Sequence, residues 1–272
     1  MGTSQSSSGP GPGVPLVPPW ADNVDSPVSG DGDEASESDE PEPDQAASVP
    51  VAPHARFRGA RRALGEFARS GDDRGLRRAF THYVRTGYDG AGTMTRRMGG
   101  TAATAGRLNG VLQSGRAPDG TELRDAILAS GNDVNVVLDA IVDAASPADG
   151  TQDKESSRRA IRDALSDLLV RFPDADFFAL TDAQRSFVIE RYTALDVYGR
   201  FCLDLQKTIM DKSPDPATAL RRLKEVREFI AEHVAAAFRT IRERGTPATI
   251  SNVTLLTRDA LRATFSVFEE YS

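Results

Sequence analysis

The sequence predicts an all-α domain, an irregular multi-helix bundle that follows a long disordered N-terminal tail. From position 55 onward, apolar residues recur at intervals of three and four, which is the spacing of one face of an α-helix. Runs of β-branched residues are few, and no alternating strand pattern extends over a useful length. The first 53 residues differ, because they hold ten of the 16 prolines and a single aromatic side chain.

Residues 1–53 bury too little apolar surface to offset the conformational entropy lost on ordering, so we expect a disordered tail. Residues 2–13 form a small, uncharged leader, and residues 21–53 form an acidic spacer punctuated by proline. Between them lies the apolar cluster of the tail, Val14-Pro15-Leu16-Val17-Pro18-Pro19-Trp20, which contains the one tryptophan of the chain. Residues 54–272 then form the helical domain.

The N-terminal half of the domain is predicted to contain helices at 55–69, 72–85, 93–114, 121–130 and 133–145. Glycine ends several of them, because it adopts the left-handed backbone conformation that closes a helix without a steric penalty. Gly71 follows the first helix, Gly87 closes the second and Gly115 follows the third.

The C-terminal half is predicted to contain helices at 152–171, 181–211, 215–243 and 253–270. Thr181 begins the second of these, and Ser213 is expected to cap the third ahead of Pro214 and Pro216. Apolar stripes identify the faces that we expect to be buried. These stripes are Val188, Tyr192, Leu195, Tyr198, Cys202, Leu205 and Ile209, then Leu220, Leu223, Val226, Ile230, Val234, Phe238 and Ile241, and finally Leu261, Phe265 and Phe268.

The formal net charge of −7 hides three unequal regions. Residues 1–55 carry ten acidic residues and no Lys or Arg, a net charge of −10. Residues 56–116 carry 13 arginines against four acidic residues, a net of +9, and residues 117–272 carry a net of −6. Like-charge repulsion should keep the acidic spacer extended and hold the leader away from the Arg-rich part of the domain.

The sequence lacks the motifs of an autonomous enzyme. Its three histidines, at positions 54, 82 and 233, fit no HExxH pattern, and no P-loop, dinucleotide-binding or nucleophile-elbow motif occurs. Cys202 lies on an apolar helix stripe, which favours an inert buried thiol over a reactive one. We therefore expect no catalytic residues, no cofactor and no metal site.

No secretory signal and no membrane span are predicted. The N-terminus lacks a basic n-region with an apolar core, and no apolar run approaches the ~18–20 residues of a transmembrane helix. Arginine outnumbers lysine 29 to 4, which is typical of a protein from a high-GC bacterium. The simplest expected location is the bacterial cytoplasm.

Arginines cluster between positions 56 and 97. Arg77, Arg78, Arg96 and Arg97 are candidates for binding an anion or a partner, since guanidinium groups form paired hydrogen bonds with phosphates. A nucleic-acid-binding regulatory protein that uses this region is therefore an alternative function. The simpler interpretation, which we favour, places these arginines on solvated helix faces, where they pair with acidic surfaces that include the tail.

The N-terminus itself carries a reactive group. A small second residue favours removal of Met1, which leaves the free α-amine of Gly2 at the end of the leader. The reference pKa of an α-amine is about 7.7–8.0, so part of the population is a neutral nucleophile near pH 7. Considered without any resemblance, Gly2 is more simply an ordinary residue of a flexible tail.

Three segments share their residues with one known family. The first combines Met1-Gly2-Thr3-Ser4, the Ser/Gly/Pro leader and the Val14–Trp20 cluster, and it is the most specific of the three. The others are Gly90-Ala91-Gly92-Thr93 with Arg96-Arg97-Met98-Gly99-Gly100, and Val267-Phe268-Glu269-Glu270-Tyr271. In these segments the chain resembles the QatB proteins of the four-gene Qat anti-phage defence system.

The resemblance implies a non-enzymatic component that works beside a P-loop ATPase, a QueC-like enzyme and a TatD-like nuclease. QueC enzymes use ATP to activate a deazaguanine carboxylate and transfer it to an amine, so the α-nitrogen of Gly2 would be the acceptor. Thr3 and Ser4 would be recognised as the adjacent peptide. Trp20 and its neighbours in the apolar cluster would dock the tail on the modifying enzyme or on the ATPase, for which the helical domain would serve as adaptor.

Overall fold

The computed structural model describes residues 14–17, 51–52, 55–124, 133–243 and 250–271. Within these ranges the regular secondary structure is helical, which confirms the predicted all-α class. Two isolated antiparallel bridges also occur there, Pro15 with Val51 and Arg116 with Glu122. Most of the predicted helix at 121–130 and most of the predicted disordered tail lie outside the described residues.

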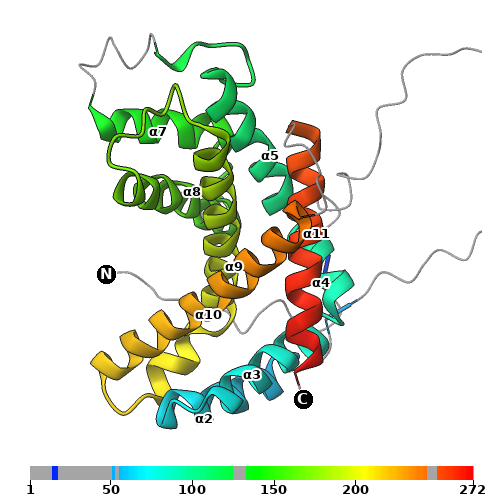
Figure 1. Ribbon diagram of the computed structural model, residues 1–272. Coiled ribbons are helices and arrows are strands. Elements are labelled where there is room, and N and C mark those ends of the chain that lie inside the picture. The colour runs from blue at the N-terminus through cyan, green and yellow to red at the C-terminus, as the bar shows by residue number, and fades with distance from the viewer. Residues whose placement is uncertain (1–13, 18–50, 53–54, 125–132, 244–249, 272) are drawn as a thin grey trace, which may run out of the picture.

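Figure 1 labels the helices in chain order. They are α2 (Arg58–Ser70), α3 (Asp73–His82), the π-helical turn η1 (Tyr83–Gly87), α4 (Ala91–Arg97), α5 (Gly99–Ser114), α7 (Val134–Ala145), α8 (Gln152–Arg171), α9 (Asp182–Lys212), α10 (Pro216–Arg242) and α11 (Ile250–Glu270).

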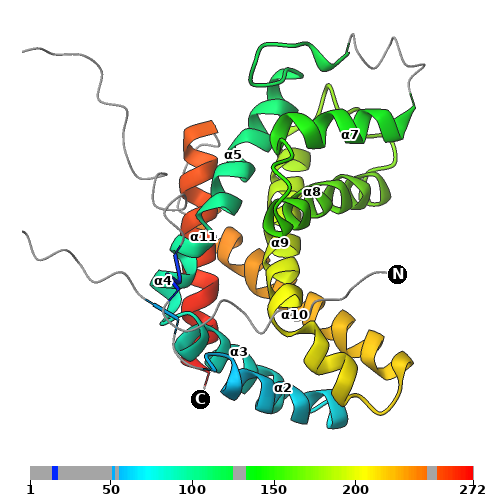
Figure 2. The ribbon, with the colours of Figure 1, turned by 180° about the vertical axis from the view of Figure 1, so that it is seen from behind.

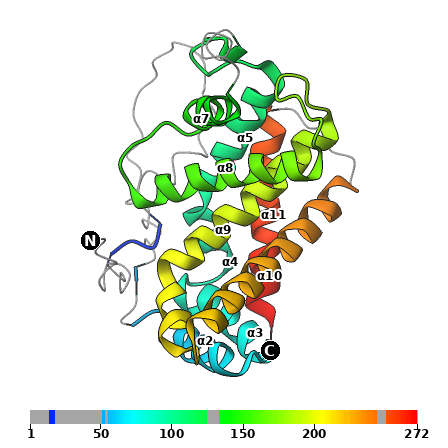
Figure 3. The ribbon, with the colours of Figure 1, turned by 90° about the vertical axis from the view of Figure 1, so that its left-hand side faces the viewer.

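The 31-residue helix α9 runs through the middle of the molecule, where it contacts α2, α5, α8 and α10. Figure 3 shows α7 and α8 towards one end of the molecule and the pair α2–α3 at the other. Helix α11 packs along α4, α5 and α10 and ends beside α3, as the view from behind also shows (Figure 2). The bundle is therefore built around α9, and helices from both halves of the chain cover it.

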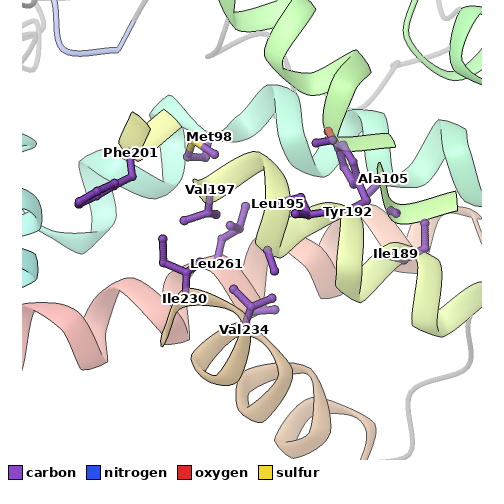
Figure 4. Close-up of a cluster of buried hydrophobic side chains, with 14 of the residues drawn as sticks. Met98, Ala105, Ile189, Tyr192, Leu195, Val197, Phe201, Ile230, Val234 and Leu261 are labelled. Atoms are coloured by element: carbon purple, nitrogen blue, oxygen red, sulfur yellow. The ribbon is translucent and has the colours of Figure 1, made fainter. Parts of the chain in front are cut away.

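One cluster of buried hydrophobic side chains lies between α5, α9, α10 and α11 (Figure 4). Val197 and Phe201 of α9 gather there with Ile230 and Val234 of α10 and with Leu261 of α11, and all five side chains are buried. Because neighbouring helices cover α9 from several directions, more of its surface is apolar and buried than a single amphipathic stripe would provide.

The predicted apolar stripes are buried with three exceptions. Leu220, in the second turn of α10, is 63% exposed, so its assignment to the buried face is wrong. Ala219 occupies that turn of the buried face instead, because it stands four residues before the buried Leu223. Tyr198 and Cys202 on α9 are half-buried and pack against the edge of the core.

Two predicted helices are interrupted in the structure. The helix predicted at 72–85 ends as an α-helix at His82, and the chain continues through η1. The helix predicted at 93–114 divides at Met98, whose φ of −92° and ψ of 15° separate α4 from α5. Gly99 and Gly100 follow directly, and the conformational freedom of paired glycines lowers the cost of such a break.

The glycine stops at Gly71 and Gly115 and the start of α9 are confirmed, whereas Gly87 is the last residue of η1 and does not adopt a positive φ. Gly71 and Gly115 adopt left-handed φ values of 75° and 68° at the ends of α2 and α5. Thr181 forms a capping box with Gln184, in which each side chain binds the main-chain N–H of the other residue.

The predicted cap of α10 is wrong. Ser213 ends α9 and does not cap the next helix. Asp215 takes that role, because its Oδ1 accepts a hydrogen bond from the Thr218 N–H at 2.8 Å, and Pro216 supplies the first helical position.

Candidate functional site

The carboxylate of Asp204 lies inside the bundle, on α9, with 4% of its side chain exposed. The hydroxyls of Tyr83 and Tyr88 donate hydrogen bonds to its Oδ2 at 2.8 and 2.6 Å. The guanidinium groups of Arg200 and Arg56 lie 3.5 and 3.9 Å from its oxygens. These partners offset a desolvation cost that would amount to several kcal/mol for an isolated buried charge.

The π-helical turn η1 explains how two tyrosines reach one carboxylate. Hydrogen bonds of a π-helix join residues five positions apart, so residues with that separation lie on nearly the same side. Tyr83 and Tyr88 have this separation, and both side chains are buried. Burial, and then the charge of Asp204, raises the pKa of both hydroxyls, so they remain neutral donors.

A chain of polar contacts leads outward from Asp204. Arg200 Nε donates to the Tyr88 hydroxyl at 3.0 Å, and Arg200 Nη1 pairs with Asp153 at the start of α8. Asp153 also pairs with Arg97 at the end of α4. Burial alone would raise the pKa of Asp153, but the guanidinium groups of Arg200 and Arg97 hold it below its usual value. These three charged groups join α4, α8 and α9.

The chain of polar contacts ends at a cavity of about 590 Å³. Its walls come from the starts of α5 and α8, the loop before α8 and the middle of α9, and the three helices meet in the upper half of Figure 3. The lining residues are Arg97, Met98, Gly100, Thr101, Ala103, Thr104, Arg107, Asp149, Thr151, Asp153, Lys154, Ser156, Ser157, Asp196, Arg200 and Leu203.

Asp196 forms part of the cavity wall although only 7% of the residue is exposed. Its Oδ2 accepts a hydrogen bond from Thr101 Oγ1 at 2.6 Å and a longer one from the Tyr192 hydroxyl at 3.4 Å. The Tyr192 hydroxyl also lies 2.8 Å from Ser157 Oγ. Burial raises the pKa of Asp196 to about 6, and the hydrogen bond from Thr101 opposes this shift.

Two cations of the cavity have no ion-pair partner in the part of the chain that the structure describes. Desolvation, followed by the charge of Arg107, lowers the pKa of the Lys154 ammonium group, and the carboxylates of Asp149 and Asp196 oppose this shift from beyond ion-pair distance. Arg107 donates to a main-chain carbonyl at 2.9 Å and to Thr104 Oγ1 at 2.8 Å, both of them uncharged acceptors. With every group ionised, the four cations and three carboxylates that line the cavity sum to a formal charge of +1.

The polar groups that line the cavity are hydroxyls, carboxylates and cations. Neither histidine nor cysteine lines it, and among the described residues no His, Cys, Asp and Glu side chains form a group that could hold a metal ion. Cys202 borders a neighbouring hollow on α9 instead. Burial raises the pKa of its thiol to about 11, so at neutral pH it remains an unreactive thiol, as the sequence predicts.

The four arginines selected from the sequence do not gather at one site. Arg97 lines the cavity and pairs with a carboxylate, whereas Arg96 is exposed on the same short helix. Arg78 pairs with Glu66 at 2.6 Å. The guanidinium carbon of Arg77 lies 5.5 Å from the centroid of the Tyr271 ring. The pairing of Arg78 and Arg97 agrees with the simpler interpretation and weakens the nucleic-acid alternative.

Part of the apolar cluster of the tail is packed into the structure. Residues 14–17 run antiparallel to residues 51–52, with a main-chain hydrogen bond of 2.8 Å between them. Leu16 and Val17 are 2% and 3% exposed, whereas Val14 is exposed. In Figure 2 this segment (blue) lies at the edge of the molecule that α4 and α11 form.

This pairing fixes residues 14–17, which follow the leader, on the helical domain. The acidic spacer at 21–53 lies almost entirely outside the described residues, so its extended conformation stays a prediction. The remaining tail positions singled out in the sequence, Gly2, Thr3, Ser4, Pro18, Pro19 and Trp20, lie outside the described residues.

The sequence did contain a signal for the polar centre that we did not identify. Asp196, Arg200 and Asp204 are spaced by four residues, so they lie along one face of α9 beside its apolar stripe. A row of charged residues that borders the apolar stripe of a long helix indicates a buried polar contact. Lys154 had no comparable signal, because its burial depends on α5 and α9, which are distant in sequence.

A family model described as "Qat anti-phage system associated protein QatB" matches residues 89–268, which is more than half of the 272 residues. The chain belongs to the QatB family. It is therefore a component of an anti-phage defence system. No significant match was found among curated proteins or among solved structures.

The QatB match runs from α4 through most of α11. It includes every residue that lines the cavity, and it includes Asp204. It begins after Tyr83 and Tyr88, so the leader and the apolar cluster of the tail precede the matched region. None of the described helices combines the length and the apolar character that a membrane-crossing segment requires.

Replacing Asp204 with Ala should lower the free energy of unfolding by about 3–5 kcal/mol, because the two tyrosines lose their buried acceptor and Arg56 loses its ion-pair partner. Urea unfolding followed by circular dichroism measures this change. Asp211→Ala serves as the control, because Asp211 pairs with Lys207 on the exposed face of the same helix, and it should cost less than about 1 kcal/mol. Equal effects of the two substitutions would contradict the central role of Asp204.

Asp196 should make the stability of the protein depend on pH. Its pKa is raised from 3.8 to about 6 in the folded chain, so the ionised group costs about 3 kcal/mol at pH 7.5, and this cost decreases as the pH falls through about 6. Asp196→Asn removes the titration and keeps an acceptor for Thr101. The difference in unfolding free energy between variant and wild type should shift by about 1.4 kcal/mol in favour of wild type between pH 7.5 and pH 5. A difference that stays constant over this range contradicts the assignment.

Proposed function

We propose that this QatB-family member is a non-enzymatic subunit whose N-terminal glycine is modified by a partner enzyme. After removal of Met1, the α-amine of Gly2 attacks a deazaguanine carboxylate that a QueC-like partner has activated with ATP. An amide bond forms, and the activating group leaves. Thr3 and Ser4 are the peptide that the partner recognises next to the amine.

The observation that carries this proposal is the anchoring of residues 14–17 against residues 51–52. It leaves residues 2–13 as an uncharged leader whose reach is about 40 Å when fully extended. A leader of Gly, Ser, Thr, Gln and Pro has no bulky or charged side chain, which favours its entry into a narrow active site. The buried Leu16 and Val17 hold the base of the leader on the domain, while Pro18, Pro19 and Trp20 dock the partner.

The helical domain acts in this proposal as an adaptor for the P-loop ATPase of the system, with a TatD-like nuclease as a further partner. The domain supports this role because its buried carboxylate and ion pairs hold helices from both halves of the chain in one arrangement. A body held in this way is suited to presenting an N-terminal amine to a second protein.

Intact mass spectrometry of the chain co-expressed with its neighbouring gene products tests the acceptor assignment. The wild-type chain should lose Met1 and gain the mass of one deazaguanine group, and fragmentation should place that mass on Gly2. Gly2→Glu should abolish the addition because Met1 is then retained. Gly9→Ala, a matched change within the leader, should leave the addition intact. A wild-type mass equal to that of the Met-cleaved chain alone would contradict the assignment of Gly2 as the acceptor.

A further inference from the structure

We propose that the cavity between α5, α8 and α9 binds a small molecule through a phosphate group. Its volume of about 590 Å³ lies within the 300–1,000 Å³ range of small-molecule sites. The proposal concerns the helical domain alone and does not depend on any modification of the N-terminus.

The charges of the cavity favour an anion. Of the three carboxylates that line it, Asp153 is neutralised by Arg97 and Arg200. Asp149 accepts hydrogen bonds from the main-chain N–H and the hydroxyl of Thr151 at 2.9 and 2.7 Å, and Asp196 accepts its bond from Thr101 inside the wall. The cationic groups of Lys154 and Arg107 remain without ion-pair partners among the described residues.

Both of these cations can donate further hydrogen bonds. An ammonium group has three donors and a guanidinium group has five, and Arg107 uses Nε and Nη2 on uncharged acceptors. Phosphate oxygens form strong, charge-assisted hydrogen bonds with such groups. Lys154 is half-buried, so a phosphate that reaches it is partly shielded from water.

The start of α5 adds a second source of positive potential in the same cavity. Met98, which precedes this helix, provides no side-chain cap for its first turn. Gly100 and Ala103 of that end line the cavity, and their small side chains allow a ligand to approach the main chain. The first turn of this 16-residue helix, where the positive end of its dipole lies, therefore forms part of the cavity lining.

The cavity lining also narrows the ligand class. Met98 and Leu203 are its large apolar side chains, and no aromatic ring lines it. A nucleobase would find no stacking partner, so recognition rests on the phosphate groups rather than on a base. Inorganic pyrophosphate and the polyphosphate part of a nucleotide share this chemistry.

Isothermal titration calorimetry of the full chain with inorganic pyrophosphate tests the proposal, and a parallel titration with ATP distinguishes the source of the phosphate. Pyrophosphate should bind saturably at one site. Tighter binding of ATP identifies a nucleotide as the ligand, and equal or weaker binding identifies a free polyphosphate. Lys154→Met should weaken the binding at least about tenfold, because it removes a charge-assisted contact.

Two further variants make the test specific. Lys207→Met removes an exposed lysine from α9, outside the cavity, and should leave pyrophosphate binding unchanged. Ala103→Leu keeps every charge but fills part of the cavity, and it should weaken binding as Lys154→Met does. The proposal is overturned if pyrophosphate does not bind up to ~10 mM, well above the range in which small ligands bind specific sites. It is also overturned if binding survives both cavity substitutions, or if Lys207→Met weakens it equally.

Discussion

The buried carboxylate of Asp204 is the interaction on which the rest of this structure depends. A charge inside a helical bundle is tolerated only with close partners, and here they come from three places: Arg56 beside the tail, the two tyrosines around η1, and Arg200 one turn away on α9. Arg56 and the two tyrosines hold the part of the chain before α4 against α9. Because Arg200 also pairs with Asp153, the same centre positions the start of α8 and one wall of the cavity.

The helices could be predicted from the sequence wherever a local signal determines them. The helix at 152–171 and the glycine ends at Gly71 and Gly115 were predicted correctly because periodicity and left-handed glycine act within one turn. The break at Met98 and the exposure of Leu220 were not predicted, because packing between helices decides both. The cavity was not predicted for the same reason, because the residues that surround Lys154 and Arg107 come from helices that are distant in sequence.

The QatB family match lies within the helical body and begins after the N-terminal leader. In our account the body fixes the base of the leader through residues 14–17, which pair with residues 51–52. The cavity lies in the same body, between α5, α8 and α9, where we place the phosphate-bearing ligand.

A double-mutant cycle between Asp204 and Tyr88 tests the central claim most directly. Asp204→Ala removes the acceptor of the 2.6 Å hydrogen bond, and Tyr88→Phe removes its donor. If this carboxylate organises the bundle, the two losses of unfolding free energy should be coupled by at least about 1 kcal/mol, as for residues in one buried network. Additivity within about 0.3 kcal/mol would show that the two groups act independently, and it would contradict the account.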